Sequence, residues 1–368
     1  MRLGLVVNPV AGMGGSVGLR GTDGPALEEA LRRGARPVAP GRAVEFLRHL
    51  LGIGVTVELV VAGGQMGLEE AIAAGAGRLV AEAVGVGGPR TTREDTVRAA
   101  RAMASRVDLL VFVGGDGTAR DIVDAVGTSV PCLGVPSGVK TYSAVFANTP
   151  AEAAKVVEAF SRGAAELAER EVVDADEEAL RRDELSLRVY GYLLVPVVGG
   201  LVQPSKGLHS GPDEEGNKDA IARYLAETME PGTPYILGPG STVKALSRYV
   251  EGRLTLLGVD VVVDRKVLMS DAWERDLLEV LDRYGRAYVV VTPIGRQGFI
   301  FGRGNKQISP AVLRRVGKEN VVVVATASKM AELEVLRVDT GDAEVDRMLR
   351  GYYKVLVDYG RYAIMRAL

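Results

Sequence analysis

Five consecutive residues, Gly114 to Thr118, combine three glycines, one carboxylate and one hydroxyl in the order GGDGT. An apolar run over 109–114 precedes the aspartate and a helix-like run follows it, so the sequence predicts a loop between a strand and a helix. Gly114, Gly115 and Gly117 allow the backbone to approach an anion closely. The hydroxyl of Thr118 and the first amides of the helix can donate hydrogen bonds to phosphate. The pattern therefore favours a phosphate-binding loop.

Asp116 is the unexpected member of such a loop, because a carboxylate repels polyphosphate unless a cation or a substrate hydroxyl lies between them. We therefore predict that Asp116 is a catalytic base, a ligand of Mg²⁺, or both. Asp121, further along the same helix, is a second predicted magnesium ligand, and Asp260 and Asp271 are weaker candidates for the base. The structural alternative is a tight turn in which Asp116 caps the helix.

A second glycine cluster, NPVAGMGGSVGLRGTDG at 8–24, follows the first predicted strand. Loops that leave the carboxyl ends of parallel strands share one edge of a sheet, so this cluster is expected to open into the same crevice as GGDGT. A flexible loop is the alternative interpretation. The predicted phosphate-binding residues of the cluster are Asn8, Gly12, Gly14 and Gly15, with Gly18 and Arg20 as further contacts.

The segment GVPSGVKTYSAVFA at 134–147 repeats the order of strand, glycine turn and helix. Lys140 lies in the expected first helical turn, together with Thr141 and Ser143, and is a predicted phosphate ligand because its charge can neutralise an anion. A solvent-exposed lysine is an equally good interpretation.

Two segments in the second half of the sequence also combine glycines with polar groups. In LGPGSTVKAL at 237–246, we predict that Gly240, Ser241 and Thr242 contact a nucleotide or substrate, whereas a capped helix start is the alternative. The segment IGRQGFIFGRGNKQIS at 294–309 predicts either an anion site or a solvated β-hairpin. Its hydrogen-bond donors are Arg296, Gln297, Arg303, Asn305, Lys306 and Gln307.

The elements that position these loops follow from the apolar pattern. In the first 150 residues, strand-like runs at 3–8, 55–61, 109–114 and 131–137 alternate with helical periodicity. These runs lack the polar alternation of half-exposed strands, so they predict an α/β domain with a mostly parallel sheet that is covered on both faces. From about residue 165, extended segments predict a β-rich second domain. The predicted boundaries are 1–150, 151–335 and 336–368, and the last segment is expected to pack, with a return to the first domain as one alternative.

Composition narrows the classes of function. The 368 residues are 47% apolar, which is enough for two domains with buried cores. A net charge of -2 gives no general electrostatic footprint for nucleic acid or anionic membrane, so small-molecule partners are expected. Cys132, His49 and His209 form no cluster with metal-ligand spacing, and neither histidine is predicted to be catalytic. No segment resembles a signal peptide or a membrane span, so a cytoplasmic location is expected.

The GGDGT sequence after an apolar strand resembles the superfamily of NAD kinases, diacylglycerol and sphingosine kinases, and phosphofructokinases. The chain is most similar to its ATP-NAD kinase-like, or AcoX-like, branch through the glycine segments quoted above, FVGGDGTARD and LRVDTGD. The resemblance implies a Rossmann-like N-terminal domain and a β-rich C-terminal domain. It also implies phosphoryl transfer from ATP or polyphosphate to a hydroxyl with Mg²⁺, and a homo-oligomer.

The acceptor implied by the resemblance is the adenosine ribose 2′-hydroxyl of NAD. The asparagine-glutamate pair with which NAD kinases hold the dinucleotide does not occur in this sequence, and the asparagine-proline-glycine start at Asn8 resembles that of lipid kinases. A lipid, sphingoid or polyol acceptor is therefore the alternative. A non-catalytic nucleotide sensor is a third interpretation, which the negative charge of Asp116 disfavours.

Overall fold

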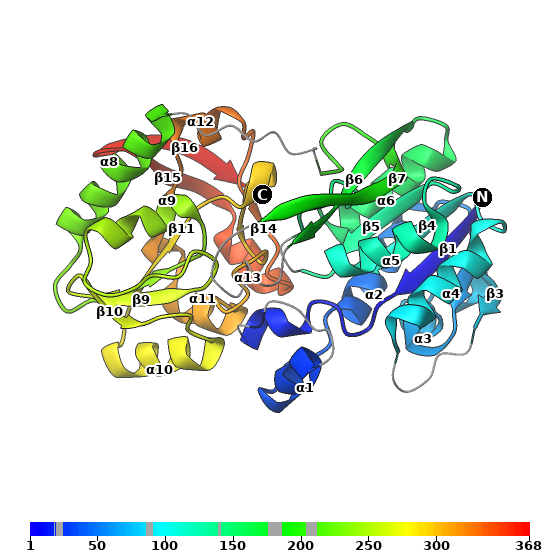
Figure 1. The fold of residues 1–368 in the computed structure, drawn as a ribbon, viewed down its shortest axis with the longest axis horizontal. Coiled ribbons are helices and arrows are strands. Elements are labelled where there is room, and N and C mark those ends of the chain that lie inside the picture. The colour runs from blue at the N-terminus through cyan, green and yellow to red at the C-terminus, as the bar shows by residue number, and fades with distance from the viewer. Residues whose placement is uncertain (18, 20–24, 86–90, 139–140, 176–185, 204–211) are drawn as a thin grey trace. The chain divides into compact units, whose positions relative to one another are not determined.

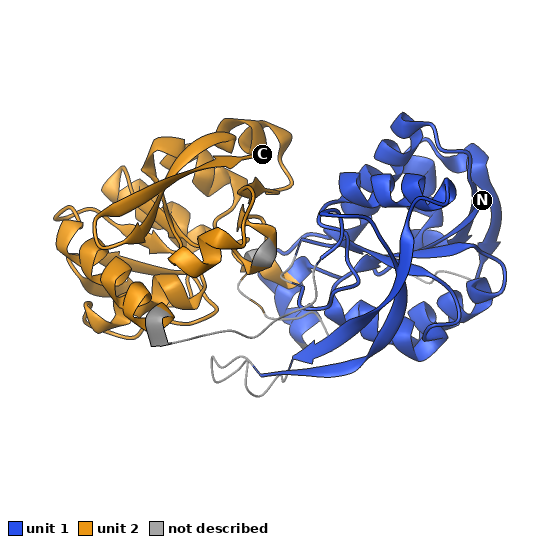
Figure 2. Cartoon of the chain, turned by 90° about the horizontal axis from the view of Figure 1, so that it is seen from above, with its two compact units in different colours: residues 1–13, 21–180, 185–206 blue, residues 14–20, 181–184, 207–368 orange. Residues whose placement is uncertain are grey.

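The computed structural model describes residues 1–17, 19, 25–85, 91–138, 141–175, 186–203 and 212–368. The chain forms two compact units (Figure 2), and each unit has its own buried apolar core. Unit 1 comprises Met1–Met13, Gly21–Leu180 and Leu185–Lys206. Unit 2 comprises Gly14–Arg20, Arg181–Glu184 and Gly207–Leu368.

Unit 1 is built on a five-stranded parallel sheet in the order β3-β2-β1-β4-β5 (Figure 1). The strands are β1 (Arg2–Val7), β2 (Glu58–Ala62), β3 (Val80–Val84), β4 (Leu109–Gly114) and β5 (Cys132–Pro136). Every residue of β4 and β5 is buried, which explains their unbroken apolar runs. The expected parallel sheet is confirmed. The strand that sequence analysis missed, β3, is rich in alanine and contains a glutamate, both of which have low strand propensity.

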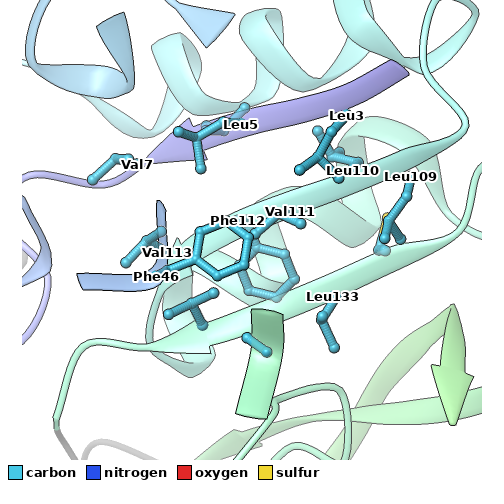
Figure 3. Close-up of a cluster of buried hydrophobic side chains, with 14 of the residues drawn as sticks. Leu3, Leu5, Val7, Phe46, Leu109, Leu110, Val111, Phe112, Val113 and Leu133 are labelled. Atoms are coloured by element: carbon cyan, nitrogen blue, oxygen red, sulfur yellow. The ribbon is translucent and has the colours of Figure 1, made fainter. Parts of the chain in front are cut away.

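Helices cover both faces of this sheet. One pair, α2 (Ala39–Ile53) and α6 (Pro150–Ser161), packs together, as does the pair α4 (Arg93–Ala104) and α5 (Asp116–Val126). Figure 3 shows the core between the layers, where Phe46 of α2 and Phe112 of β4 lie among leucine and valine side chains. The shorter elements of unit 1 are α1 (Pro25–Arg32), α3 (Leu68–Ala73), η2 (Gly64–Met66) and η3 (Gly77–Leu79), whereas η1 (Met13–Val17) belongs to unit 2 except for Met13.

A two-stranded antiparallel ribbon of β6 (Glu166–Ala175) and β7 (Leu187–Val197) completes unit 1. From the sequence, these extended segments are expected in the second domain. The structure instead packs them on α5, where a Cβ atom at Gly191 would lie 2.7 Å from Val123 Cγ1. Val172 and Leu193 of the ribbon are fully buried in the core of unit 1, and this apolar burial determines where the ribbon docks.

Unit 2 is strand-rich, with a seven-stranded mixed sheet in the order β10-β9-β8-β11-β13-β15-β16. Strands β8, β11, β13 and β15 are parallel, and the remaining three pair antiparallel. A short sheet pairs β12 with β14. The expected β-rich second domain is confirmed. Its strands are β8 (Tyr235–Leu237), β9 (Asp260–Val263), β10 (Lys266–Met269), β11 (Tyr288–Val291), β12 (Phe299–Phe301), β13 (Val321–Val324), β14 (Arg337–Val338), β15 (Gly351–Asp358) and β16 (Arg361–Ala367).

Helices connect the parallel strands of unit 2, which sequence analysis did not anticipate. The tail 336–368, which was allowed to return to the first domain, instead forms the β15–β16 edge of this sheet. Every described helix of the protein is too short or too polar to cross a membrane. The helices of unit 2 are α8 (Pro212–Thr228), α9 (Ser241–Lys244), α10 (Glu274–Tyr284), α11 (Pro310–Val316), α12 (Ala327–Ala331), α13 (Ala343–Leu349), η4 (Ala245–Arg248), η5 (Gly295–Gln297) and η6 (Lys318–Asn320).

Candidate active site

The strand order of unit 1 reverses between β1 and β4, and ligands of open α/β sheets bind at the carboxyl ends of the strands on either side of such a reversal. Asn8 follows β1 and the GGDGT loop follows β4. The Asn8 side-chain amide donates a hydrogen bond of 3.0 Å to Thr118 Oγ1. The Asn8 backbone amide donates to the carbonyl of Val113, also at 3.0 Å. The structure therefore brings these two predicted binding residues together across the reversal point.

Each glycine of the GGDGT loop lies in a different local environment. A Cβ atom on Gly114 would lie 2.3 Å from Thr118 Oγ1, so a side chain there would displace the threonine that Asn8 contacts. Gly115 is the N-cap of α5, with φ of -122°. At Gly117, the Cβ position is open apart from the Nη2 atom of Arg120, 3.6 Å away. The first turn of α5 therefore presents backbone amides without side-chain obstruction at Gly117, as an anion site requires.

Asp116 is the first residue of α5, not its N-cap. Its carboxylate accepts hydrogen bonds from the backbone amides of Tyr142 at 2.8 Å and Ser143 at 2.9 Å. These bonds tie the start of α5 to the segment that follows β5. An ionised carboxylate has about four acceptor positions, of which these amides occupy two.

The segment that Asp116 holds has further anchors in unit 1. The Ser143 hydroxyl accepts a bond of 2.9 Å from the backbone amide of Val173 in β6. The Thr141 hydroxyl accepts a bond of 2.8 Å from the side-chain amide of Gln203. Sequence analysis named Thr141 and Ser143 only as companions of Lys140. Lys140 itself, like Gly18 and Arg20, lies outside the described residues.

Gly12 lies against the end of β5. Its φ is +81°, and a Cβ atom there would lie 2.4 Å from the carbonyl oxygen of Ser137. The Ser137 amide in turn donates to the carbonyl of Gly114 at 2.9 Å. The loops that follow β1, β4 and β5 thus meet at one edge of the sheet, as predicted from their order.

Gly14 and Gly15, predicted with Asn8 and Gly12 as one phosphate loop, belong to η1 and to unit 2. A Cβ atom on Gly15 would lie 3.0 Å from Cδ of Lys306, so this glycine packs on one of the predicted donors. The role of both glycines in phosphate binding stays a prediction.

The Asp121 side chain contacts α4. It is 8% exposed, and its Oδ1 atom lies 2.9 Å from Nε of Arg93. Among the described residues, no group of three or more histidine, cysteine, aspartate or glutamate side chains is arranged to hold a metal ion. A magnesium role for Asp121 stays a prediction, which the ion pair with Arg93 makes less favourable.

One glycine loop at this edge, GGQMG at 63–67, is not among the predicted site segments, although it follows the predicted strand 55–61. A Cβ atom on Gly67 would lie 3.0 Å from the carbonyl oxygen of Leu5, so Gly67 allows the loop to pack on β1. Glu70 is 4% exposed, and burial raises the pKa of its carboxyl above the usual range, although backbone hydrogen bonds oppose this shift. Burial also raises the pKa of the Cys132 thiol, which makes it a poor nucleophile.

In unit 2, Gly240 precedes the one-turn helix α9 with φ of +117°, and a Cβ atom there would lie 2.8 Å from Cγ2 of Thr292. Ser241 is exposed, whereas Thr242 is 2% exposed. Lys244 is buried, and its ammonium group forms an ion pair with Asp260 and donates to the carbonyl of Leu237 at 3.2 Å. This geometry agrees with a packed helix start, and substrate contact by Gly240, Ser241 and Thr242 stays a prediction.

Asp260, a weaker candidate for the base, is fully buried. Its carboxylate accepts bonds of 2.9 Å from the amide and the hydroxyl of Thr255, and from the amide of Asp271, the other weak candidate. These bonds and the ion pair with Lys244 indicate a structural role for Asp260.

Replacing Lys244 by methionine is expected to lower the free energy of unfolding by about 3–5 kcal/mol, because it removes the cation that pairs with the buried carboxylate of Asp260. Lys266→Met, which removes an exposed ion pair with Glu251, is the matched control and is expected to cost about 1 kcal/mol or less. Urea denaturation of both variants measures the difference. A fully stable Lys244→Met protein with weakened nucleotide binding would instead make Lys244 a ligand contact.

The donor cluster at 294–309 is largely part of the core of unit 2. Arg303 is 2% exposed and stacks on Phe299 with 4.3 Å between the guanidinium carbon and the ring centroid. Asn305 is 1% exposed, and its side-chain amide donates to the carbonyl of Ile300 at 2.8 Å. This burial contradicts the solvated hairpin, because donor type alone does not report which donors fold inward, whereas the anion site stays a prediction.

Two domain models of one family match this chain. The ATP-NAD kinase N-terminal domain matches residues 3–165, and the ATP-NAD kinase C-terminal domain matches residues 232–367. The chain belongs to the ATP-NAD kinase family. The N-terminal match contains Asn8, Gly12 and the whole GGDGT loop, and the two-domain architecture expected from the sequence is that of the family.

Comparisons with solved structures and with curated proteins give weaker similarity than the domain models. A solved structure of a candidate diacylglycerol kinase from Bacillus anthracis str. Sterne has 14% sequence identity and a TM-score of 0.24. The alignment covers 64% of this chain and 59% of that chain, which is less than two thirds of its length. Among curated proteins, none matches this sequence.

Proposed function

We propose that this member of the ATP-NAD kinase family is a phosphotransferase that moves a phosphoryl group from ATP, or from polyphosphate, to a hydroxyl. The observation that carries the proposal is the position of Asp116, a carboxylate in the first turn of the helix that opens a glycine loop at the reversal point of the sheet. Family membership agrees with this position. A helix start that only bound phosphate would gain nothing from a negative charge there.

In this mechanism the chain mainly positions groups and neutralises charge, which supplies most of the catalysis in phosphoryl transfer. The first amides of α5, including that of Gly117, donate hydrogen bonds to donor phosphate oxygens. Asn8 and Thr118, bonded to each other at 3.0 Å, fix the loops after β1 and β4 in one geometry. Asp116 orients the acceptor hydroxyl and accepts its proton as the oxygen attacks phosphorus. The bond from phosphorus to the bridging oxygen of the donor breaks in the same transfer, and that oxygen leaves with the shortened phosphate chain.

The residues at the loop fit Mg²⁺ in the form that nucleotide sites commonly use. Protein sites hold this ion through one or two carboxylates together with substrate phosphates and water. Asp116 supplies one carboxylate, and the charge of the bound ion would offset its repulsion of polyphosphate.

For the acceptor, we propose the adenosine ribose 2′-hydroxyl of NAD, because the family models that match both domains are those of ATP-NAD kinases. Because the asparagine-glutamate pair of NAD kinases does not occur in this sequence, the test also includes a second class of acceptor. Lipid, sphingoid and polyol hydroxyls are the competing substrates.

The test offers NAD, NADH, sphingoid bases, diacylglycerol and small polyols in parallel, each with ATP or polyphosphate and Mg²⁺, and detects phosphate transfer by the mass of the product. Formation of NADP alone is the expected result. A phosphorylated lipid or polyol without NADP would overturn the acceptor assignment and leave the kinase assignment intact.

One observation favours a nucleotide sensor as the second candidate function. The Asp116 carboxylate already accepts the amides of Tyr142 and Ser143, which is a structural role that needs no reaction. Tight binding of ATP or NAD without any product in the screen would support the sensor and refute the kinase.

A further inference from the structure

Arg120 is a cation beside the glycine loop that the GGDGT pattern does not include. It lies four residues after Asp116 on α5, and residues at this spacing share one face of a helix. Its Nη2 atom is 3.6 Å from the position that a Cβ atom of Gly117 would occupy. The guanidinium therefore lies beside Gly117 in the first turn of α5.

The orientation of Arg120 is set by Asp174 of β6. Arg120 Nη1 donates to Asp174 Oδ1 at 2.5 Å, and Asp174 is 7% exposed. The other oxygen of Asp174 accepts from Arg188 of β7, at 3.2 Å from Nε and 2.9 Å from Nη2. Two guanidinium groups thus share one carboxylate, so the cluster of Arg120, Asp174 and Arg188 carries a net positive charge.

This cluster connects directly to the segment held by Asp116. Val173, the neighbour of Asp174, donates its amide to the Ser143 hydroxyl, and the Ser143 amide donates to Asp116. Asp116 and Arg120 are thus joined both along α5 and through β6. The carboxylate and the guanidinium are held in one rigid arrangement.

A glycine loop that contains a carboxylate needs positive charge to retain a polyphosphate, because Asp116 opposes the field of the helix start. Arginine suits this task, since its planar group can bond a carboxylate with one edge while another N–H meets a phosphate oxygen. Arg120 offers both edges here: Nη1 is on Asp174 and Nη2 faces the loop. Its side chain is 30% exposed, which leaves it accessible to a ligand.

We propose that Arg120 is a phosphate-binding residue of the glycine loop, oriented by Asp174, and that it recognises the polyphosphate chain of the donor. The proposal rests on the proposed function for the identity of that ligand. Its geometry predicts anion binding whether or not a phosphoryl group is transferred. Arg188, with a side chain that is 79% exposed, supplies the second charge that keeps the cluster positive.

The test measures binding of inorganic tripolyphosphate, ATP and adenosine by calorimetric titration of the whole chain at fixed salt. Arg120→Gln is expected to weaken tripolyphosphate and ATP binding by about 10-fold to 100-fold, the range for losing a charged hydrogen bond, and to leave adenosine binding unchanged. Arg120→Lys keeps the charge and loses the planar fork. Its affinity for tripolyphosphate is expected to lie between that of the parent protein and that of Arg120→Gln. Arg93→Gln is the matched control, because it removes an arginine that forms an ion pair with a different residue of α5, Asp121.

Asp174→Asn separates ligand binding from a structural role. If Arg120 only holds α5 to β6, Asp174→Asn and Arg120→Gln break the same ion pair and alter anion affinity alike. If Arg120 binds phosphate, Asp174→Asn keeps an acceptor oxygen that can orient Arg120 and removes a competing negative charge, so tripolyphosphate affinity is expected to stay equal or to rise.

Unchanged tripolyphosphate affinity in Arg120→Gln, or an equal loss in Arg93→Gln, would overturn the proposal. If Asp174→Asn fails to fold, this comparison of the two arginine variants decides alone. Tripolyphosphate binding that depends on Arg120 in a protein without turnover would support the inference and refute the kinase. Turnover in a protein whose ATP affinity does not depend on Arg120 would support the kinase and refute the inference about Arg120.

Discussion

Asp116→Asn is expected to lower phosphoryl transfer by about 100-fold or more, the scale for losing a positioned acid–base group. Asparagine keeps the size of the side chain but cannot take the proton of the acceptor hydroxyl. ATP binding is expected to persist, because the substitution removes a negative charge from the loop. A turnover assay and a titration with ATP on the purified variant measure the two effects separately.

The same substitution has a structural cost that must be separated from chemistry. Asparagine has one acceptor oxygen, so it can keep only one of the bonds from Tyr142 and Ser143, and its amide group opposes the other N–H. We expect this to cost about 1–3 kcal/mol of stability.

Ser143→Ala is the matched control for Asp116→Asn. It loosens the same segment by removing the hydroxyl that accepts from Val173 and leaves the Asp116 carboxylate in place. A melting temperature lowered to a similar extent, with turnover within a few-fold of the parent protein, is the expected result. Equal losses of turnover in Ser143→Ala and Asp116→Asn would show that the carboxylate acts only by holding the segment.

Gly12→Ala is expected to lower ATP affinity by about 10-fold or more and to destabilise unit 1 by about 3 kcal/mol. Two causes add. An alanine with φ near +81° pays about 1–2 kcal/mol of left-handed strain, and its Cβ atom would lie 2.4 Å from the backbone oxygen of Ser137. A backbone carbonyl cannot rotate away as a side chain can, so the loop after β1 must shift relative to β5 and to the GGDGT loop.

Gly54→Ala separates the effect of the contact with Ser137 from the effect of left-handed backbone strain. Gly54 ends α2 with φ of +79°, and no atom lies within 4 Å of its Cβ position. This variant is expected to lose only the strain energy, about 1–2 kcal/mol, with unchanged ATP affinity. Thermal melting and ATP titration of both variants are the measurements. Identical behaviour of Gly12→Ala and Gly54→Ala would show that contact of Gly12 with Ser137 has no importance for the site.

The sequence alone determined the parallel sheet of unit 1 and the position of the GGDGT loop. Strands buried on both faces must be apolar throughout, so four of the five left a readable run, and only the alanine-rich edge strand β3 was missed. Once the strands are parallel, their carboxyl ends share an edge. The proximity of the loops that contain Asn8, Gly12 and Asp116 was therefore predictable from the order of the strands along the chain.

Only the tertiary structure decided what the polar side chains contact. Nothing in local spacing shows that Asp116 accepts the amides of Tyr142 and Ser143, that Asp121 turns to Arg93, or that Arg303 is buried. Arg120 could have been suspected from its four-residue distance to Asp116, but its partner Asp174 lies 54 positions away. Hydrogen bonds and ion pairs between distant segments depend on how the ribbon and helices dock. That docking is set by the burial of apolar surface summed over many residues, which no short motif encodes.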